Sequence, residues 1–314
     1  MTGRPLEGRP VGLAVNPASG SGRGRAAGAV AAARLAAAGA RAVHLGGATF
    51  AELARHAQAA LGELDALVVV GGDGMVHTGV NLVAGTATPL GIVPAGTGND
   101  VARALGLPLA DPAAATDLVV AALAGSAVRV VDAVRITGDG DGPSRWFAGV
   151  LGAGFDAVVN ERANGWSWPR GRARYTLAVA RELPVFRQRR YTVELDGTPW
   201  EVSAMLVAVA NAASYGGGMR VAPDAVMDDG LLDVVVAGPI SRIGFVRVFP
   251  SVFSGGHLDH PAVTVRRARR VRVSTHPDDP PVVAYADGER IAALPLLMEA
   301  VPGALHLLAP GPAG

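Results

Sequence analysis

Glycine-rich segments with polar neighbours follow short apolar runs at three places in the first hundred residues. Residues 16–22 read Asn-Pro-Ala-Ser-Gly-Ser-Gly, residues 71–74 read Gly-Gly-Asp-Gly, and residues 94–100 read Pro-Ala-Gly-Thr-Gly-Asn-Asp. Glycine lets a ligand approach the backbone, and the free N–H groups at the start of a helix attract phosphate. The first segment alone is equally typical of an ordinary turn between a strand and a helix, whereas a plain turn would not need the three glycines of the second. Three of them together favour a nucleotide site.

The elements around these segments place all three at one edge of a sheet. Up to about residue 130, short apolar runs alternate with Ala-rich helical stretches, which is the rhythm of a parallel sheet covered by helices. Polar loops at the carboxyl ends of such strands are where open α/β sheets bind ligands, and Asp73 could orient magnesium or a nucleotide hydroxyl there. The expected strands span 11–15, 42–45, 66–70 and 90–93, and the expected helices span 25–38, a stretch from Phe50, and a stretch capped by Asp111 that ends near Leu123.

From residue 128 onward, apolar and polar residues alternate between Gly, Pro and Asp turns, which predicts a mainly antiparallel, β-sandwich-like module. One helical interruption is expected over 172–183, and residues 304–308 are expected to form a last strand that returns to the N-terminal domain. The predicted fold is α/β, with a parallel-sheet domain over 1–130 and a β-rich domain over 131–314. Strands are expected at 191–195, 202–209, 232–236, 263–265, 271–273 and 282–285.

Composition excludes several kinds of chemistry. The chain of 314 residues has no cysteine, so disulfides, Cys-ligated metals and a thiolate nucleophile are excluded, and a reducing cytoplasm is compatible. All 28 basic residues are arginine, so a phosphate site must use backbone N–H groups, Arg or a metal instead of the usual lysine. A net charge of +1 does not favour nucleic acid as a partner.

Membrane contact is expected to be peripheral. No apolar run approaches the roughly 18 residues that a spanning helix needs, and the first residues lack the apolar core of a signal peptide. We expect a cytoplasmic protein that touches a membrane surface. Residues 166–175 mix aromatic and basic side chains, and could rest on an anionic bilayer or begin a packed helix, which we favour.

Eight motifs in order along the chain resemble the bacterial diacylglycerol kinase and sphingosine kinase superfamily. Any one of them is weak, and their order and spacing across nearly the whole chain carry the resemblance. They are Asn16-Pro17-x-Ser19-Gly20, Gly71-Gly72-Asp73-Gly74, Pro94-x-Gly96-Thr97-x-Asn99-Asp100, Gly152-x-Gly154-Phe155-Asp156, Gly216-Gly217-Gly218, Pro223-x-Ala225, Asp229-Gly230-x-Leu232 and Asp287-Gly288-Glu289.

The resemblance implies that the first three segments bind ATP and that Asp73 helps to position magnesium and phosphate. Met75 stands where the family usually has Thr, so a hydroxyl contact would be lost while backbone contacts remain. The residues to which the resemblance gives a nucleotide role are Asn16, Pro17, Ser19, Gly20, Thr49, Gly71, Gly72, Asp73, Gly74, Met75, Val76, His77, Thr97, Asn99 and Asp100.

The resemblance also implies catalytic carboxylates at residues 287–289, with Glu289 ahead of Asp287 as the proton acceptor and Asp73 as a further catalytic residue. Asp-Gly is a common type I′ hairpin turn, and turn statistics alone favour the hairpin. A second acidic turn resembles the family's structural magnesium loop, which implies Asp229 and the carbonyls of Val226 and Leu231 as ligands. Two acids before Gly are otherwise commonly a solvated turn.

The function implied is an ATP- and Mg²⁺-dependent lipid kinase that phosphorylates the hydroxyl of a diacylglycerol-like lipid to give phosphatidic acid. ATP would bind the domain over 1–130 and the lipid would bind the domain over 131–314. The two substrates would meet in the cleft between the domains. Other lipid alcohols remain open as the acceptor, and the chain could form a homodimer. The alternatives are a kinase of NAD or a sugar phosphate that shares the Gly-Gly-Asp-Gly loop, against which motifs 96–100 and 152–156 argue, and an inactive nucleotide-binding regulator.

Overall fold

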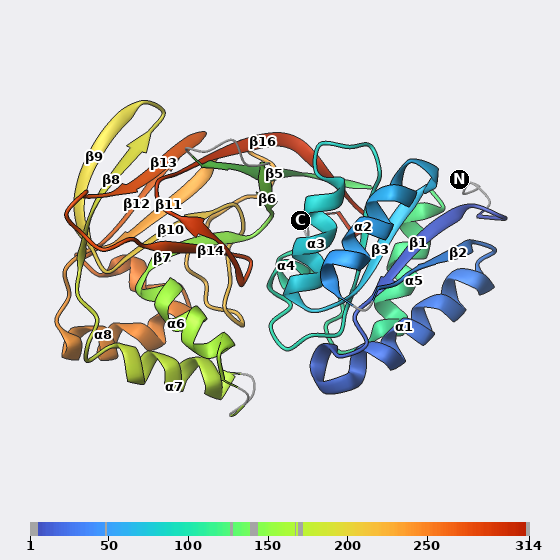
Figure 1. Ribbon diagram of the computed structural model, residues 1–314, viewed down its shortest axis with the longest axis horizontal. Coiled ribbons are helices and arrows are strands. Elements are labelled where there is room, and N and C mark those ends of the chain that lie inside the picture. The colour runs from blue at the N-terminus through green and yellow to red at the C-terminus, as the bar shows by residue number, and fades with distance from the viewer. Residues whose placement is uncertain are drawn as a thin grey trace. The chain divides into compact units, whose positions relative to one another are not determined.

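The computed structural model describes residues 6–47, 49–125, 128–138, 144–166, 168 and 172–311. The chain divides into two units, which we call unit 1, Met1–Val131 with Gly303–Gly314, and unit 2, Asp132–Pro302. One long strand, β16 (Leu296–Leu307), begins in unit 2 and ends in unit 1 (Figure 1).

Unit 1 contains the predicted parallel sheet. Its strands run in the order β2 (Arg41–Leu45), β1 (Pro10–Val15), β3 (Ala66–Gly71) and β4 (Leu90–Pro94), and the end of β16 lies parallel to β4. All residues of β3 are buried because this Val-rich strand is central and covered on both faces. The four N-terminal strands thus agree with their predicted positions within one residue at each end.

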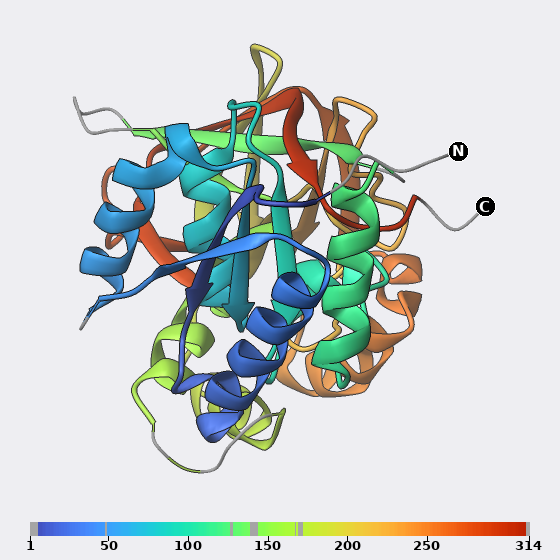
Figure 2. The same ribbon diagram turned by 90° about the vertical axis from the view of Figure 1, so that its right-hand side faces the viewer.

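Helices cover both faces of this sheet (Figure 2). On one face α1 (Ser19–Ala37) and α5 (Pro112–Leu123) pack side by side, and the Asp111 carboxylate caps α5 as predicted, accepting the N–H groups of Ala113 and Ala114 at 3.0 Å. The other face carries α2 (Phe50–Ala60), η1 (Leu61–Glu63) and α3 (Asp73–Val83), and α4 (Asp100–Ala104) follows β4. Since α3 begins at Asp73, the Gly-Gly-Asp-Gly segment is a strand end joined directly to a helix start.

Unit 2 is a sandwich of antiparallel sheets around a core that includes Phe147, Leu151 and Tyr191. One sheet has the order β12 (Val263–Ala268), β11 (Leu232–Ala237), β10 (Leu206–Ala210), β7 (Val150–Gly154), β14 (Val283–Ala286) and β15 (Glu289–Ala293). The opposite sheet contains the first part of β16, β13 (Arg270–Thr275), β8 (Arg189–Leu195), β9 (Thr198–Ala204), β5 (Arg129–Gly138) and β6 (Arg145–Phe147). The predicted fold class, α/β followed by a β-sandwich-like domain, is confirmed.

Two predictions for unit 2 are wrong. The strand expected over 202–209 is two strands, because the chain crosses from one sheet to the other at Met205, whose N–H donates to Ala237 and whose carbonyl accepts from Phe155. The single helical interruption expected over 172–183 is present as α7 (Arg172–Glu182), but it is not alone. The structure adds α6 (Phe155–Asn164), α8 (Arg242–Val248), η2 (Phe249–Phe253) and η3 (Gly256–Asp259).

The aromatic and basic stretch over 166–175 leads into α7, whose Ala178 and Val179 are buried against Phe155 and Val159 of α6. The packed-helix interpretation therefore holds for this helix, while Trp168 before it is 79% exposed. Arg170 lies outside the described residues. Within the ranges described, no helix is both long and apolar enough to cross a membrane.

Candidate active-site residues

The second and third glycine-rich segments touch each other at the ends of β3 and β4. The Ala95 N–H donates to the Gly71 carbonyl at 2.7 Å, and a Cβ added to Gly96 would lie only 2.4 Å from the Cα of Gly72. Asn99 locks the third segment, since its side-chain amide accepts the Gly96 N–H at 3.0 Å and donates to the Gly96 carbonyl at 3.1 Å. Larger residues at 72 or 96 would force the two segments apart.

Asp73, the first residue of α3, ties the third segment to the second. Its carboxylate accepts the N–H of Asp100 at 2.7 Å and that of Asn99 at 3.0 Å, which the left-handed conformation of Asn99 (φ 55°) turns toward it. Gly98 must be glycine, because a Cβ there would lie 2.4 Å from the Asp73 carboxylate. Burial raises the pKa of Asp73, and the two backbone N–H groups and Arg103 act in the opposite direction.

The first segment reaches the same place. Gly20, Ser21 and Gly22 are all left-handed, with φ of 58°, 63° and 97°, so they interrupt the first turns of α1. A Cβ on Gly20 would lie 2.1 Å from the Ala95 carbonyl oxygen, so this glycine is required for the close approach. The structure therefore brings together the three segments that the sequence analysis assigned to one sheet edge.

The other residues given a nucleotide role lie in different surroundings. Met75 and Val76 are buried in α3 and their N–H groups donate to the Gly72 carbonyl, so neither side chain faces solvent. Thr49 accepts the Glu52 N–H at 3.1 Å and caps α2 after the edge strand β2. His77 is half-buried on α3, Asn16 caps its own turn by accepting the Ala18 N–H at 3.0 Å, and Pro17 and Thr97 are exposed.

Two arginines that the sequence analysis missed connect these segments. Arg23 donates from Nε to the Gly20 carbonyl and from Nη2 to the Gly96 carbonyl, both at 3.1 Å, and so bridges the first and third segments. Arg103 on α4 donates from Nη2 to the Gly98 carbonyl at 3.1 Å. The signal was available in the sequence: in a chain without lysine, Arg23 and Arg103 come within a helical turn of the first and third glycine-rich segments and are candidate cations for a phosphate.

In unit 2, residues 287–289 form the β14–β15 hairpin. Ala286 pairs with Glu289, and the two turn residues Asp287 and Gly288 have φ of 51° and 84°, as a type I′ turn requires. The buried Asp287 carboxylate accepts three backbone N–H groups, from Ala148 at 3.0 Å, Gly149 at 2.9 Å and Val150 at 3.2 Å. Glu289 is exposed.

Asn211, another residue that the sequence analysis missed, holds the backbone that grips Asp287. It is fully buried, and its side chain donates to the carbonyls of Ala148 at 2.9 Å and Asp132 at 3.1 Å. Its own N–H donates to the Gly149 carbonyl at 2.9 Å. The Asp-Gly turn is thus fixed through two successive layers of hydrogen bonds.

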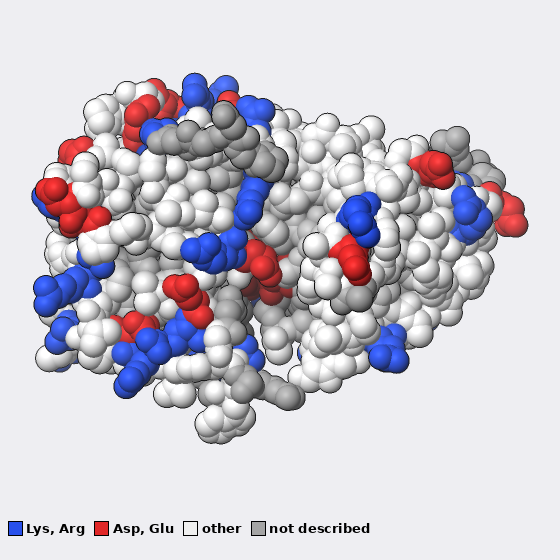
Figure 3. All heavy atoms as spheres, in the orientation of Figure 1, with Lys and Arg blue, Asp and Glu red and all other residues white. Residues whose placement is uncertain are grey.

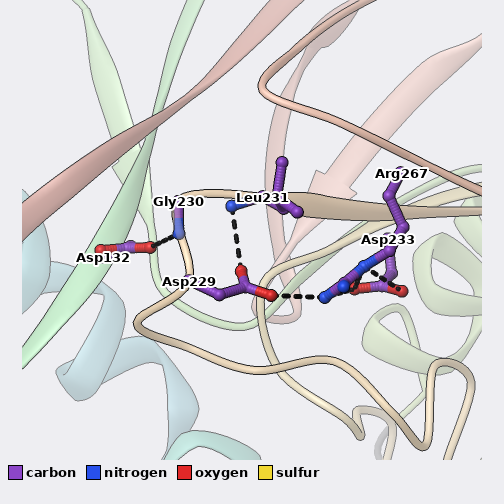
Figure 4. A network of polar contacts seen from close by, with 6 residues as sticks. All are labelled: Asp132, Asp229, Gly230, Leu231, Asp233 and Arg267. Carbon is purple, nitrogen blue, oxygen red and sulfur yellow. Dashed lines mark hydrogen bonds and ion pairs between the residues drawn. The ribbon is translucent and has the colours of Figure 1, made fainter.

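The acidic turn over 228–230 is held by an arginine (Figure 4). Asp229 accepts the Leu231 N–H at 3.0 Å and forms an ion pair with Arg267, whose Nε also lies 3.3 Å from Asp233. No group of three or more His, Cys, Asp or Glu side chains is placed to hold a metal among the residues that the structure describes. With a guanidinium already on the Asp229 carboxylate, the arrangement does not fit the magnesium loop that the resemblance implied.

An apolar pocket lies on the face of the six-stranded sheet away from the sandwich core. It is lined by Phe155 after β7, Met205 before β10, and Phe245 and Phe249 of α8 and η2, with His257 among its few polar members. The phenyl rings of Phe155 and Phe245 meet edge to face at 5.1 Å, and those of Phe245 and Phe249 stack at 5.4 Å.

Two of the eight motifs shape this pocket. A Cβ at Gly152 would lie 2.2 Å from the Asp156 carboxylate, so the Gly-x-Gly-Phe-Asp motif lets Asp156 fold back beside its own strand. Gly216, Gly217 and Gly218 all have positive φ, and their turn pairs Tyr215 with Met219, two residues of the pocket wall.

Known proteins match both units. The diacylglycerol kinase catalytic domain matches residues 10–136, and the YegS C-terminal NAD kinase β-sandwich-like domain matches residues 149–309. These matches, on a parallel-sheet unit with three converging glycine-rich segments, define a nucleotide-binding kinase. The chain belongs to the diacylglycerol kinase family of lipid kinases. The resemblance drawn from the eight motifs is thereby confirmed.

Individual relatives agree. A diacylglycerol kinase of Mycobacterium tuberculosis (strain ATCC 25618 / H37Rv) is 42% identical over 298 residues, covering 94% of this chain and 93% of the relative. A diacylglycerol kinase of Bacillus subtilis (strain 168) is 30% identical and covers 69% of each chain. A crystal structure of a diacylglycerol kinase from Bacillus anthracis str. Sterne superimposes with a TM-score of 0.71 at 21% identity over 96% of this chain and 97% of that one, which shows the shared fold.

Proposed function

We propose that the protein transfers the γ-phosphoryl group of ATP to the hydroxyl of diacylglycerol or a closely related lipid alcohol, giving phosphatidic acid in the first case. The apolar pocket of unit 2 carries this choice of acceptor. Its lining of Phe, Met and Val side chains suits a hydrocarbon chain, whereas NAD or a sugar phosphate would require cationic and hydrogen-bonding groups. The pocket therefore favours the lipid over both alternative acceptors.

ATP binding is assigned to the three glycine-rich segments of unit 1. Their backbone allows close approach of the triphosphate, and Arg23 and Arg103 supply positive charge in place of lysine. The half-buried Asp73 carboxylate is assigned to positioning magnesium. Each of its oxygens accepts one backbone N–H, and no guanidinium among the described residues occupies them as one does at Asp229, so a cation could still approach and would offset the burial that raises the pKa of Asp73. When bound with ATP, magnesium neutralises charge on the phosphates.

Proton transfer is assigned to Glu289. As the lipid oxygen forms its bond to the γ-phosphorus, its O–H bond breaks and the proton moves to the Glu289 carboxylate, while ADP leaves. Glu289 is exposed and can reach a substrate, whereas both oxygens of Asp287 accept backbone N–H groups. Asp287 is accordingly the residue that positions the turn and Glu289 the base.

The route of the lipid is assigned to α8, which lies over the pocket. Phe245 and Val248 line the pocket from this helix, while Ile243 is 68% and Val246 is 60% exposed on its outer side. Arginines gather over the part of the surface where α7 and α8 lie, with acidic side chains among them (Figure 3). Apolar side chains flanked by arginine suit the headgroup region of an anionic membrane, from which the acceptor would enter the pocket.

The test is ATP turnover with a panel of acceptors in mixed micelles: diacylglycerol, monoacylglycerol, ceramide, a long-chain base and, as a polar control, NAD. We expect Mg²⁺-dependent phosphorylation of diacylglycerol at a rate at least tenfold above the other acceptors, with none in excess chelator. Phosphorylation of NAD alone would overturn the proposal. ATP binding without turnover of any acceptor would instead support the inactive regulator.

A further inference from the structure

The turn before β11 is organised around one guanidinium group. Asp233 of β11 and Arg267 of β12 are direct partners in the antiparallel ladder, so the strand register itself holds Arg267 beside Asp233. From there Arg267 reaches Asp229 with Nη2 and Asp233 with Nε, the latter at 3.3 Å (Figure 4). One side chain thus bridges two carboxylates that are four residues apart in the sequence.

These carboxylates need a cation. The Asp233 side chain is only 7% exposed and that of Asp229 is 25% exposed, so water alone does not stabilise their negative charges. Burial raises the pKa of Asp233, Arg267 opposes that rise, and the charges of Asp229 and Asp224 add to it. Without Arg267, two partly buried negative charges would face each other.

Arg267 already occupies the carboxylate that a metal ion would need at this turn. Of the two Asp229 oxygens, one accepts the Leu231 N–H at 3.0 Å and the other meets Arg267, so a divalent cation on this carboxylate would have to displace a like charge. A planar guanidinium with several donors suits the bridging of two carboxylates better than a point charge does. The Gly230 N–H, between the two, donates to Asp132 at 2.7 Å and so is also satisfied within the protein.

We propose that Arg267 is the structural cation of this turn and that unit 2 is stabilised there without bound Mg²⁺. This inference does not depend on the acceptor of the kinase reaction, since it concerns the stability of unit 2 alone. It also predicts a latent site: removing the guanidinium exposes Asp229 and Asp233 to a divalent cation, so the variant should acquire the metal dependence that the parent lacks.

The experiment measures the midpoint of thermal unfolding without nucleotide, in EDTA and in millimolar Mg²⁺ or Ca²⁺. The parent is expected to shift by less than about 1 °C between these conditions. Arg267→Gln is expected to unfold at least about 5 °C lower in EDTA, because an uncompensated charge is left partly buried, and to regain part of that loss in Mg²⁺ or Ca²⁺. Arg267→Lys keeps the charge and should remain indifferent to the metal.

Arg266→Gln is the matched control. Arg266 is the neighbouring residue of β12 and lies over the Trp200 ring at 4.0 Å, so its loss changes a cation–π contact and no carboxylate. Its unfolding midpoint should not respond to metal. A Mg²⁺- or Ca²⁺-dependent stabilisation of the parent that disappears in Asp229→Asn would overturn the proposal. This comparison remains decisive even if Arg267→Gln fails to fold.

Discussion

Two carboxylates of one turn, Asp287 and Glu289, have opposite surroundings. Asp287 is in the left-handed conformation and buried, with three backbone N–H groups on its oxygens, whereas Glu289 begins the next strand and is exposed. Backbone N–H groups occupy both oxygens of Asp287, which makes this carboxylate a poor proton acceptor, whereas the exposed Glu289 side chain lies where a substrate can reach it. The type I′ hairpin and the catalytic assignment are therefore compatible, because the turn presents one carboxylate and is held by the other.

Substitution of each carboxylate should separate these roles. Glu289→Gln removes the base and keeps size, so kcat for the lipid should fall about 100-fold with the unfolding midpoint unchanged. Asp287→Asn places an NH₂ group against backbone N–H donors, so it should lower the unfolding midpoint as well as kcat. Kinetics in mixed micelles and thermal unfolding measure the two effects. Parental turnover by Glu289→Gln would remove Glu289 from the reaction.

Arg23 should act on ATP rather than on the lipid. Its guanidinium bridges the Gly20 and Gly96 carbonyls, so its positive charge lies where the first and third segments meet. Arg23→Gln should raise the KM for ATP about tenfold, as expected for the loss of one charged hydrogen-bonding group, and leave the KM for the lipid unchanged. Arg25→Gln, an exposed arginine on the same helix, is the control and should behave as the parent.

His257 should give stability a dependence on pH. Burial in the pocket wall lowers its pKa below the ordinary 6.5, and its Nε2–H donates to the Val221 carbonyl at 3.1 Å. The unfolded chain therefore binds more protons below about pH 6.5, so this contribution to stability is present above that pH and is lost as the pH falls through the folded pKa.

Thermal unfolding between pH 8 and pH 5 tests this contribution. His257→Gln should flatten the decline of the midpoint below about pH 6.5, whereas the exposed His44→Gln should retain the parental profile. Identical slopes for the parent and His257→Gln would show that His257 does not titrate against folding.

Residue types and spacing predicted which backbone segments would converge, but not what each side chain does there. Asp73 was expected to position magnesium and phosphate, and it also fastens the third segment through the Asn99 and Asp100 N–H groups. At position 75 we expected a hydroxyl contact to be lost, because Met stands where the family usually has Thr. The structure buries the Met75 side chain in unit 1. Such contacts depend on the φ of Asn99 and on the register of β3 and β4, neither of which the sequence displays.

At the scale of elements, the apolar residues of α8 lie on two sides of the helix, one facing the pocket and one facing outward. Phe245 and Val248 close the pocket, and Ile243 and Val246 point outward. Ile243→Asp and Val246→Asp should each reduce co-sedimentation with phosphatidylglycerol vesicles about tenfold, since an apolar side chain is worth about 1.5–3 kcal/mol when buried. Turnover of a water-soluble, short-chain diacylglycerol should stay within about twofold.

Phe50→Asp makes the same chemical change at a 50% exposed residue of α2 in unit 1 and should leave vesicle binding unchanged. If Ile243→Asp and Phe50→Asp bind vesicles equally well, α8 does not face the membrane.

Strands were predicted better than helices because period-two alternation shows clearly in β8 and β13. The α6 helix was missed: it begins at Phe155, directly after a strand, with no polar capping residue and with glycine at φ 102° before it. The seven-residue α8 was missed because its apolar residues cover two faces, so no stripe appears at helical spacing.

At the scale of the whole molecule, the chain completes unit 1 only at its end. Leu305, Leu307 and Leu308 are buried in unit 1, and the Leu308 N–H donates to Leu90 at 2.9 Å. Deleting residues after Pro302 should uncover the edge of β4 and remove these side chains, each typically worth 2–5 kcal/mol. Unit 1 should then be cleaved by trypsin at least about tenfold faster. A chain that stops after Pro310 should resist cleavage as the parent does, and equal resistance of both truncations would contradict the role of β16.

The tryptophan and tyrosine residues are distributed unevenly between the two units. All four tryptophans and all four tyrosines, at positions 146, 166, 168 and 200 and at 175, 191, 215 and 285, belong to unit 2. Unit 1 contains Phe50 as its one aromatic side chain apart from histidine. Ultraviolet emission excited at the indole band therefore reports on unit 2 alone, and the site assigned to ATP is optically silent. A change in that emission when nucleotide is added would show that nucleotide binding alters the surroundings of unit 2.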